Sequence, residues 1–210
     1  MNNIIKQLIN NTPEEFSNLI KTYPHHSHKM LCLTDASKIA DKDGIWAEFG
    51  VHSGATLREL TNVKDLVYGF DSWEGLPEEW NFENLKGAFN TGGVIPFEPN
   101  SKMILIQGWF NESLPNFIKQ TDISKISLLH LDADLYSSTK CVLDNFKPFF
   151  KGKCIMVFDE FFNYPEWEKH EYKAFKEFVI DMEQNIINID ILSYSSSGYH
   201  PVSFNIEFKQ

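Results

Sequence analysis

Basic side chains are scarce in this sequence of 210 residues. Arg58 is the sole arginine, and 19 lysine and arginine residues face 29 aspartates and glutamates, which gives a formal net charge of −10 at pH 7. Such a surface would repel the phosphate backbone of a nucleic acid. The composition therefore argues against a nucleic-acid partner. It favours neutral or cationic small molecules, or anions held by backbone amides or by a metal.

Cysteine and long apolar segments are scarce as well. The three cysteines are widely spaced and form no Cys-x-x-Cys motif, which argues against a disulfide framework and a thiolate zinc site. No segment reaches the roughly 20 apolar residues of a membrane span, and the first residues lack the pattern of a secretory signal. We therefore expect a cytoplasmic protein that does not enter a membrane.

Short β-rich runs alternate with helix-length segments after residue 43. Strands are predicted over residues 45–49, 66–70, 103–106, 126–131 and 154–158. Helices are predicted over residues 55–62, 113–120, 138–149 and 167–185. Residues 187–194 and 202–208 read as a closing antiparallel hairpin. The alternation predicts an α/β fold with a doubly wound, Rossmann-like, mostly parallel sheet, helices on both faces and a ligand crevice at the carboxyl ends of the strands.

The chain before this alternation reads as helical. Residues 4–22 carry an amphipathic pattern that Thr12 and Pro13 either cap or split, and residues 30–40 read as a second helix. The histidines at 25–28 are expected to lie in a solvated connection. We therefore divide the chain into an N-terminal helical segment, residues 1–42, serving as a cap or an oligomer contact, and an α/β domain, residues 43–210.

A glycine-containing turn follows the first predicted strand of the domain. Gly50 and Gly54 let the backbone pass close to a ligand, and the exposed amides of the next helix favour polar or anionic groups. Asp71 lies 21 residues after Gly50, at the end of the next predicted strand, where a carboxylate can accept both hydroxyls of a ribose. The spacing suggests an adenosine-containing cofactor. His52 and Ala55 stand where a nicotinamide fingerprint has glycine, so pyrophosphate binding is disfavoured.

Acidic pairs end two further apolar strands. Asp132 and Asp134 follow one strand, and Asp159 and Glu160 follow the next. Parallel strands joined by a helix are usually neighbours, so Asp132, Asp159 and Glu160 should converge. Neither motif contains lysine or arginine, and oxygen-only ligation suits Mg²⁺, Mn²⁺ or Ca²⁺. A divalent cation is therefore the expected neutraliser. His130 could orient Asp132, although a hydrogen-bonded core histidine is the simpler interpretation.

Four motifs together, over about residues 29–180, resemble the macrocin (TylF-like) O-methyltransferase family, which is part of the class I S-adenosylmethionine-dependent methyltransferases. The motifs are Glu48-Phe49-Gly50-x-x-Ser53-Gly54, Gly69-Phe70-Asp71-Ser72-Trp73-Glu74-Gly75-Leu76-Pro77, Leu131-Asp132-x-Asp134-Leu135-Tyr136-x-Ser138-Thr139 and Phe158-Asp159-Glu160.

The resemblance implies a seven-stranded sheet, a cofactor and a metal ion. The metal would be Mg²⁺ or another divalent cation on carboxylates that match Asp132, Asp159 and Glu160. S-adenosylmethionine would lie at the first two strand ends and be contacted by Glu48, Gly50, Ser53, Gly54, Asp71, Ser72, Gln107, Gly108 and Asp132.

These observations predict a metal-dependent O-methyltransferase that acts on a hydroxyl of a small acceptor, such as a sugar or a glycosylated or catecholic metabolite. Asp132 or Asp134 would take the proton. The aromatic loops containing Trp80 and Trp167 are expected to wall the acceptor pocket, and the protein could be a homo-oligomer. Two alternatives stay open at this point: a metal-dependent hydrolase or oxygenase on a related fold, and a regulator that binds S-adenosylmethionine without turnover.

Overall fold

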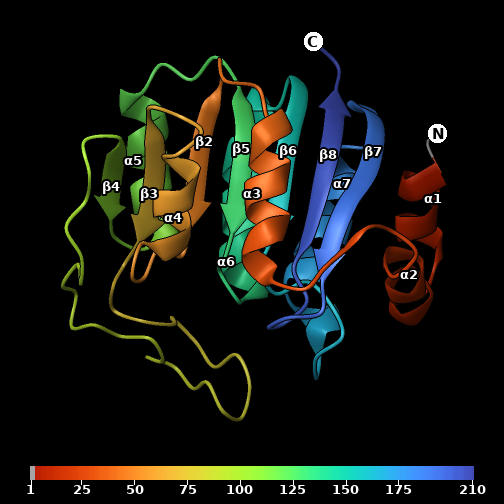
Figure 1. Cartoon of the computed structure of the whole chain (residues 1–210), viewed down its shortest axis with the longest axis horizontal. Coiled ribbons are helices and arrows are strands. Elements are labelled where there is room, and N and C mark those ends of the chain that lie inside the picture. The colour runs from red at the N-terminus through yellow and green to blue at the C-terminus, as the bar shows by residue number, and fades with distance from the viewer. Residues whose placement is uncertain (1–2) are drawn as a thin grey trace.

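The structure of the chain is a computed structural model that describes residues 3–210. In these residues one eight-stranded sheet forms the centre of the molecule, with strand order β1-β7-β8-β6-β5-β2-β3-β4 (Figure 1). The strands are β1 (His25–His26), β2 (Ile45–Phe49), β3 (Val67–Asp71), β4 (Met103–Gln107), β5 (Ile126–Leu131), β6 (Gly152–Phe158), β7 (Ile186–Ser195) and β8 (Val202–Phe208). The helices are α1 (Asn3–Asn10), α2 (Pro13–Ile20), α3 (Lys29–Ile39), α4 (Ala55–Leu60), α5 (Phe110–Gln120), α6 (Tyr136–Phe146) and α7 (Glu171–Asp181), with 3-10 turns at Lys147–Phe149 and Trp167–Lys169.

The sheet is parallel except at β8, which pairs antiparallel with both β6 and β7. This confirms the predicted Rossmann-like fold with a C-terminal antiparallel hairpin. The count of seven strands is wrong by one, because His25 and His26 add to the sheet edge as β1, parallel to Tyr194 and Ser195 of β7. The connection at residues 25–28 is therefore partly held by backbone pairing, which a histidine-rich sequence does not signal.

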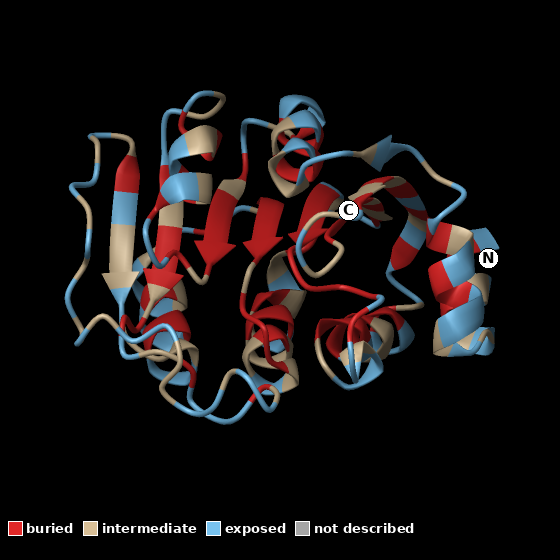
Figure 2. Ribbon diagram, turned by 60° about the horizontal axis from the view of Figure 1, so that its bottom comes forward, coloured by how far each residue is buried: buried red, intermediate tan, exposed pale blue. Residues whose placement is uncertain are grey.

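Helices cover both faces of the sheet. α3 and α4 lie on one face, and α5, α6 and α7 lie on the other (Figure 1). The central strands are buried on both sides (Figure 2), as expected of parallel strands between two helical layers. Their side chains alternate between two cores: Leu129 and Met156 pack in the core under α5–α7, whereas Leu128 and Ile155 pack in the core under α3 and α4.

The N-terminal helices are split as one of the two interpretations expected. α1 ends at Asn10, and Thr12 caps the start of α2. In this capping box the Thr12 hydroxyl accepts the Glu15 N–H and the Glu15 carboxylate accepts the Thr12 N–H. Pro13 occupies the first turn, where its missing N–H costs no hydrogen bond. Both helices pack against β7, and α1 also packs against α7. Within residues 3–210 no helix is long and apolar enough to cross a lipid bilayer.

Two helices are shorter or longer than their patterns predict. The segment predicted as helix over 167–185 is a 3-10 turn at Trp167–Lys169, then α7 from Glu171 to Asp181, and α5 begins earlier than predicted, at Phe110. Helix ends are poorly marked by periodicity, because fraying and capping depend on tertiary contacts.

The strand order reverses beside β2, which pairs with β3 on one side and with β5 on the other. At such a switch point the loops leave in opposite directions and open a crevice at the carboxyl ends of the strands. The fold therefore places the ends of β2, β3 and β5, with their loops, around one site.

Candidate active site

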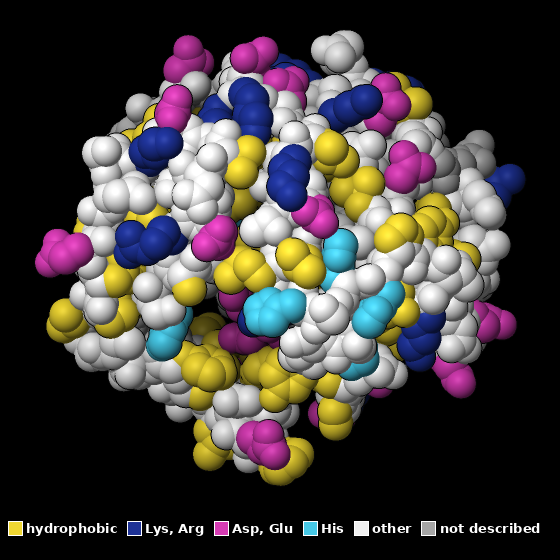
Figure 3. Space-filling model, in the orientation of Figure 1, with side chains coloured by type: hydrophobic (Ala, Val, Ile, Leu, Met, Phe, Trp, Pro, Cys, Tyr) yellow, Lys and Arg dark blue, Asp and Glu magenta, His cyan; other side chains and the backbone are white. Residues whose placement is uncertain are grey.

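A cavity of about 850 Å³ opens at the carboxyl ends of the strands. Pockets that bind small molecules span roughly 300–1,000 Å³. Its volume is thus near the upper end of that range, which leaves room for a cofactor and a second small molecule. Acidic side chains lie inside a hollow on the face shown in Figure 3. Of the residues predicted for the site, eight line the cavity: Gly50, Ser53, Asp71, Ser72, Gly108, Asp132, Asp134 and Glu160.

The glycine turn leaves β2 against the backbone of the next strand. Gly50 has φ of +92°, and a Cβ atom at this position would lie 1.7 Å from the carbonyl oxygen of Asp132. The Asp132 N–H also donates to the carbonyl of Phe49 at 2.9 Å. Glycine at 50 is therefore required by the close approach of the two strand ends, and this approach brings the cofactor turn next to the carboxylates.

Asp71 ties the turn to the end of β3. Its carboxylate accepts the N–H of His52 at 2.7 Å and the N–H of Trp73 at 2.7 Å. The indole N–H of Trp73 donates to the carbonyl of His52 at 2.9 Å, which closes the loop between the two strand ends. Asp71 lines the cavity with Ser72 beside it. Each carboxylate oxygen keeps a further lone pair, so the group is free to accept ligand hydroxyls.

Four predicted residues stand outside the cavity wall: Glu48, Gly54, Gln107 and Asp159. Glu48 is fully buried, accepts the Thr56 hydroxyl at 3.0 Å, and pairs with the ring of His130 at 2.9 Å. Gly54 begins α4 with φ of +73° against the ring of Phe97, and the Gln107 amide donates to the carbonyl of Gly93 at 2.7 Å. Glu48 thus contacts the wall of the cavity, at Thr56, from outside it.

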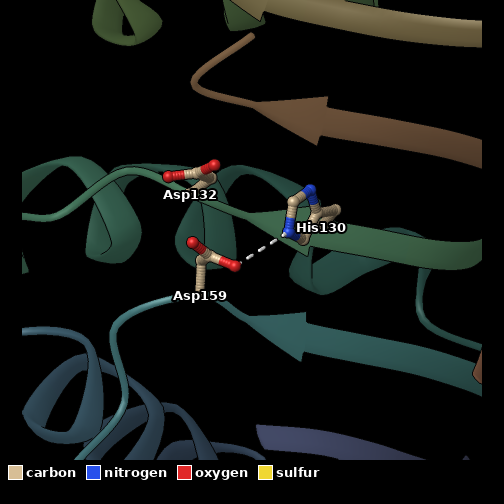
Figure 4. Close-up of side chains that lie close together, drawn as sticks. All are labelled: His130, Asp132 and Asp159. Atoms are coloured by element: carbon tan, nitrogen blue, oxygen red, sulfur yellow. Dashed lines mark ion pairs between the residues drawn. The ribbon is translucent and has the colours of Figure 1, made fainter. Parts of the chain in front are cut away.

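A group of acidic side chains lies where β5 and β6 end. Carboxylate oxygens of Asp132, Asp134 and Glu160 all lie within 4.8 Å of one another. A second group with the same spacing joins Asp132 and Asp159 to His130 (Figure 4). Asp132 belongs to both groups, so the ends of β5 and β6 lie close together. The predicted metal set of Asp132, Asp159 and Glu160 is not one group with this spacing among the described residues, because Asp134 accompanies Asp132 and Glu160, whereas Asp159 accompanies Asp132 and His130.

His130 lies beneath these acids and is paired on both sides. Its Nδ1 is 2.9 Å from a carboxylate oxygen of Glu48, and its Nε2 is 3.9 Å from Oδ1 of Asp159. Burial lowers the pKa of His130, but the interactions with the carboxylates of Asp159 and Glu48 outweigh burial and raise the pKa to about 10. His130 is buried and hydrogen-bonded to Glu48, which confirms the interpretation as a hydrogen-bonded core histidine. The raised pKa also favours the charged form of the ring.

A second cation contacts the cluster, and it comes from a residue outside the two acidic motifs. The ammonium of Lys29, the first residue of α3, forms an ion pair with Oδ2 of Asp159. Burial raises the pKa of Asp159, but the nearby charges of His130 and Lys29 hold it well below its usual range. The two motifs themselves contain no lysine or arginine, but Lys29 brings a cation to Asp159 from a helix that is distant in sequence and adjacent in space.

The remaining acids have the opposite shift. Burial, followed by the negative charge of Asp159, raises the pKa of Asp134 to about 7 and raises the pKa values of Asp132 and Glu160 well above their usual range. Asp134 also has a left-handed backbone, with φ of +59°, a conformation that aspartate tolerates better than most residues. The cluster therefore contains one acid with a lowered pKa, Asp159, and three acids with raised pKa values.

Glu171 holds the two acidic loops together. This fully buried residue opens α7, and its carboxylate accepts the N–H of Glu160 at 3.2 Å and the hydroxyl of Thr139 at 3.3 Å. The charged residues on either side of it, Lys169 and Lys173, favour a solvated helix face in the sequence, but the structure buries Glu171. A signal was present: Glu171 is three and four positions before Ala174 and Phe175, so it continues the apolar stripe of the helix.

The donor set fits a divalent cation. Asp132, Asp134 and Glu160 offer only oxygen ligands, as Mg²⁺ and Mn²⁺ prefer. Oε2 of Glu160 is buried and has no hydrogen-bond partner, which is costly unless a cation or a ligand group satisfies it. Asp159 differs from the other three because both of its oxygens face internal cations.

One aromatic prediction is borne out by the cavity wall, and the other is wrong. Trp80 lines the cavity and packs edge to face against Tyr164 and Tyr199. Trp167 instead packs on the ring of Tyr172, with ring centres 4.8 Å apart, outside the cavity wall. The 3-10 turn before α7 points this side chain toward the core, a placement that the number of aromatic residues in the loop does not reveal.

Known proteins resemble the chain in both sequence and fold. Residues 97–194 match the family model described as Macrocin-O-methyltransferase (TylF), which confirms the family resemblance indicated by the sequence motifs. A curated relative from Streptomyces olivaceus, 8-demethyl-8-(2,3-dimethoxy-alpha-L-rhamnosyl)-tetracenomycin-C 4'-O-methyltransferase, is 24% identical over 140 residues. That match covers 56% of this chain and about half, 51%, of the relative.

Solved structures show the same fold. The calicheamicin methyltransferase CalS11 has a TM-score of 0.62 at 23% identity, covering 99% of this chain and 90% of the other. The O-methyltransferase NovP has a TM-score of 0.57 at 18% identity, covering 87% and 78%. The fold is therefore the Rossmann-like fold of these methyltransferases. The matched family region, residues 97–194, contains the whole acidic cluster of β5 and β6.

Proposed function

We propose that this protein is an S-adenosylmethionine-dependent O-methyltransferase that methylates a hydroxyl of a sugar on a small natural product. The observation that carries the proposal is one cavity that joins a glycine turn and Asp71 at one end to a buried acidic cluster at the other. The family match over residues 97–194 supports it, because those residues contain the acids. The names of the relatives support a sugar acceptor, since they describe 4'-O-methylation of a rhamnosyl tetracenomycin and 3'-O-methylation of TDP-rhamnose.

The cofactor half would bind S-adenosylmethionine through the glycine turn and Asp71. The Asp71 carboxylate would accept the two ribose hydroxyls while it keeps its bonds to His52 and Trp73. The cofactor would then occupy the part of the cavity at the ends of β2 and β3, and Asp132 lines the same cavity. The sulfonium of the reactant is positive and the thioether of the product is neutral. Nearby carboxylates would therefore attract the reactant more strongly than the product.

The acidic half would hold and deprotonate the acceptor. A divalent cation on Asp132, Asp159 and Glu160, the set implied by the sequence, would bind acceptor oxygens and lower the pKa of the reacting hydroxyl when present, and it would leave Asp134 unligated. Asp134 is the residue that takes the proton in our proposal, because its pKa of about 7 matches that task near neutral pH. Asp132 is adjacent and is the alternative base. Positioning of the hydroxyl in line with the methyl group would supply much of the rate.

The cavity wall favours an amphipathic ring as acceptor. Trp80, Leu76 and Tyr199 form an aromatic and apolar side opposite the acids. A deoxysugar or a catechol presents an apolar face to such a wall and adjacent oxygens to the acids, whereas a phosphate group placed beside the acids would be repelled by them. A small neutral acceptor is therefore the partner that we propose, and the net charge of −10 disfavours nucleic acid.

A methyl-transfer screen tests this function. Purified protein is incubated with S-adenosylmethionine and a panel of rhamnosylated compounds, catechols and sugar phosphates, with Mg²⁺ or with excess EDTA, and S-adenosylhomocysteine is measured. We expect turnover of the first two classes and its loss in EDTA. Full activity in EDTA would remove the metal from the proposal, and selective turnover of sugar phosphates would overturn the acceptor class.

The two tryptophans provide a matched pair for the acceptor pocket. Trp80→Ala should raise the acceptor KM several-fold, about the effect of losing one aromatic wall, while the KM for S-adenosylmethionine changes less. Trp167→Ala removes the same side chain from outside the cavity and should leave both KM values near wild type once the folded fraction is corrected by thermal melting. Equal changes in acceptor KM for both variants would contradict the pocket that we describe.

A further inference from the structure

Lys29 occupies a position that its own helix does not favour. It is the first residue of α3, where the positive end of the helix dipole opposes a cation, and the first turn contains no acidic residue. The side chain of His28 caps this turn by accepting the Met30 N–H at 3.2 Å. The interaction that holds the Lys29 side chain is therefore its ion pair with Asp159, not the helix that it begins.

The backbone before and after Lys29 is fixed on the sheet. β1 pairs with the end of β7, and α3 packs across β6, β7 and β8, so its first turn stands at the carboxyl ends of the strands (Figure 1). The stem of the side chain runs beside Gly198, where a Cβ atom would lie 3.5 Å from Cδ of Lys29. Lys29 lines the cavity and its side chain is 39% exposed, so the ammonium can leave Asp159 for solvent without unfolding the helix.

The same ammonium faces the acids that we propose as metal ligands. Besides its ion pair with Asp159, its charge acts on Asp132 and Glu160. Asp159 is only 5% exposed and has His130 on its other oxygen, so loss of Lys29 would leave that oxygen open to another cation. A divalent cation that used Asp132, Asp159 and Glu160 together, the set implied by the sequence, would have to take the place of the ammonium.

We propose that Lys29 is a tethered counter-ion of the acidic cluster, which occupies Asp159 when no metal is bound and competes with a divalent cation for that carboxylate. The inference rests on the proposed metal site of the methyltransferase. In the metal-free protein the ammonium of Lys29 offsets part of the negative charge of the buried acids. Their mutual repulsion therefore does not open the loops that carry them. A metal binds with reduced affinity because it must displace the ammonium, and the N-terminal segment thereby sets the metal affinity of a site built by β5 and β6.

Calorimetric titration of MnCl₂ into the metal-free protein, with neither cofactor nor acceptor present, tests the competition. Lys29→Met keeps the length of the stem and removes the charge, and it should tighten Mn²⁺ binding about ten-fold, the order expected for removing one close like charge. Lys38→Met is the matched control, because Lys38 lies on the same helix, is 65% exposed and pairs only with Asp35 at 2.7 Å. Its Kd for Mn²⁺ should equal that of wild type.

A double-mutant cycle locates the effect on Asp159. In an Asp159→Asn background the carboxylate for which the two cations compete is gone, so adding Lys29→Met should change the Mn²⁺ affinity much less than it does in wild type. Unchanged or weaker Mn²⁺ binding by Lys29→Met, or an equal gain in Lys38→Met, would overturn the proposal.

Titration of S-adenosylhomocysteine into the same preparations separates this proposal from the methyltransferase function. Failure of every variant to bind Mn²⁺ while S-adenosylhomocysteine binds would overturn the competition and leave a metal-independent methyltransferase standing. Lys29→Gln, a second neutral variant, should reproduce the gain of Lys29→Met, and failure to reproduce it would count against charge as the cause.

Discussion

The two ends of the cavity are built in different ways. At the cofactor end, Asp71 is joined to backbone N–H groups of His52 and Trp73, and each contact lies within one turn or between two adjacent strand ends. At the other end, Asp132, Asp134 and Glu160 come from two strands and are balanced by His130 and by Lys29, which belongs to a distant helix. One end is organised by hydrogen bonds to the main chain and the other by buried charge.

This difference determines how each end responds to change. A hydrogen bond between a carboxylate and an amide contributes locally, so a substitution there affects its own ligand contact. Buried charges interact over several ångströms, so the loss of one member alters the ionisation of the others. We therefore expect substitutions at the acidic end to affect chemistry and stability together, and substitutions at the cofactor end to affect binding alone.

The largest effect should come from the base. Asp134→Asn keeps the size of the side chain, and asparagine also tolerates the left-handed backbone at this position. Loss of a general base costs about 10²–10⁴ in rate, so kcat should fall by that factor while the Kd for S-adenosylhomocysteine is unchanged. Wild-type kcat should rise with pH as Asp134 loses the proton that it holds with a pKa of about 7.

Steady-state rates from pH 5.5 to 9 and a calorimetric titration provide the measurements for Asp134. An asparagine variant that keeps at least a third of wild-type kcat would exclude Asp134 as the base. In that event Asp132→Asn, tested in parallel, should show the large loss instead.

The next effect concerns stability. His130→Gln removes a buried cation from between Glu48 and Asp159, and breaking such a buried pair should lower the free energy of unfolding at pH 7 by about 3–5 kcal/mol. The pKa of His130 is raised from 6.5 to about 10 in the folded chain, so its contribution is complete below pH 6.5 and is lost as pH rises through 10.

Urea unfolding of wild type and His130→Gln at pH 7 and pH 10 measures this contribution. The difference in free energy of unfolding between the two proteins should be smaller at pH 10. By that pH the wild type has lost most of the stability that the charged His130 ring contributes. His25→Gln, at an exposed histidine whose ring bonds Ser196 and packs on Tyr194 far from the acids, should show almost no difference that depends on pH. A gap of the same size at both pH values would show that His130 contributes by packing alone.

The same contrast explains what sequence reasoning could find. The strands, the glycine turn and the acids that end β5 and β6 were predictable, because alternation and motif spacing are local and strand adjacency brings the ends together. Asp71 was predicted at the cavity for the same reason, since it ends the strand next to the turn.

The residues that the sequence did not predict act across distance. Lys29 and Asp159 are 130 positions apart, and nothing in a single sequence joins a lysine at a helix start to an aspartate at a strand end. Pairing of β1 with the sheet edge likewise depends on where β7 ends. Trp167 shows the converse. Its place in the sequence predicts a side chain at the site, but the 3-10 turn Trp167–Lys169 directs that side chain onto the ring of Tyr172 instead.

The smallest effect should be found at the cofactor end. Asp71→Asn removes the charge that we assign to the ribose hydroxyls but retains an oxygen that can accept one of the two backbone N–H groups. Hydrogen bonds to a charged group contribute about 1.5–3 kcal/mol, so the Kd for S-adenosylhomocysteine should weaken by roughly 10- to 150-fold. The Kd for Mn²⁺ should stay at its wild-type value, because Asp71 is outside both acidic groups.

Calorimetry with each ligand separately measures the two constants for Asp71→Asn. Asp65→Asn serves as the control, because Asp65 lies just before the same strand, is exposed, and pairs only with Lys102 at 3.0 Å. That variant should bind both ligands as wild type does. If Asp71→Asn weakened both ligands equally, the two ends would be one coupled unit, since the turn held by Asp71 passes against the carbonyl of Asp132 at Gly50. A higher Kd for S-adenosylhomocysteine with an unchanged Kd for Mn²⁺ would instead show that the cofactor end is held by local hydrogen bonds. The two ends of the cavity would then be energetically independent.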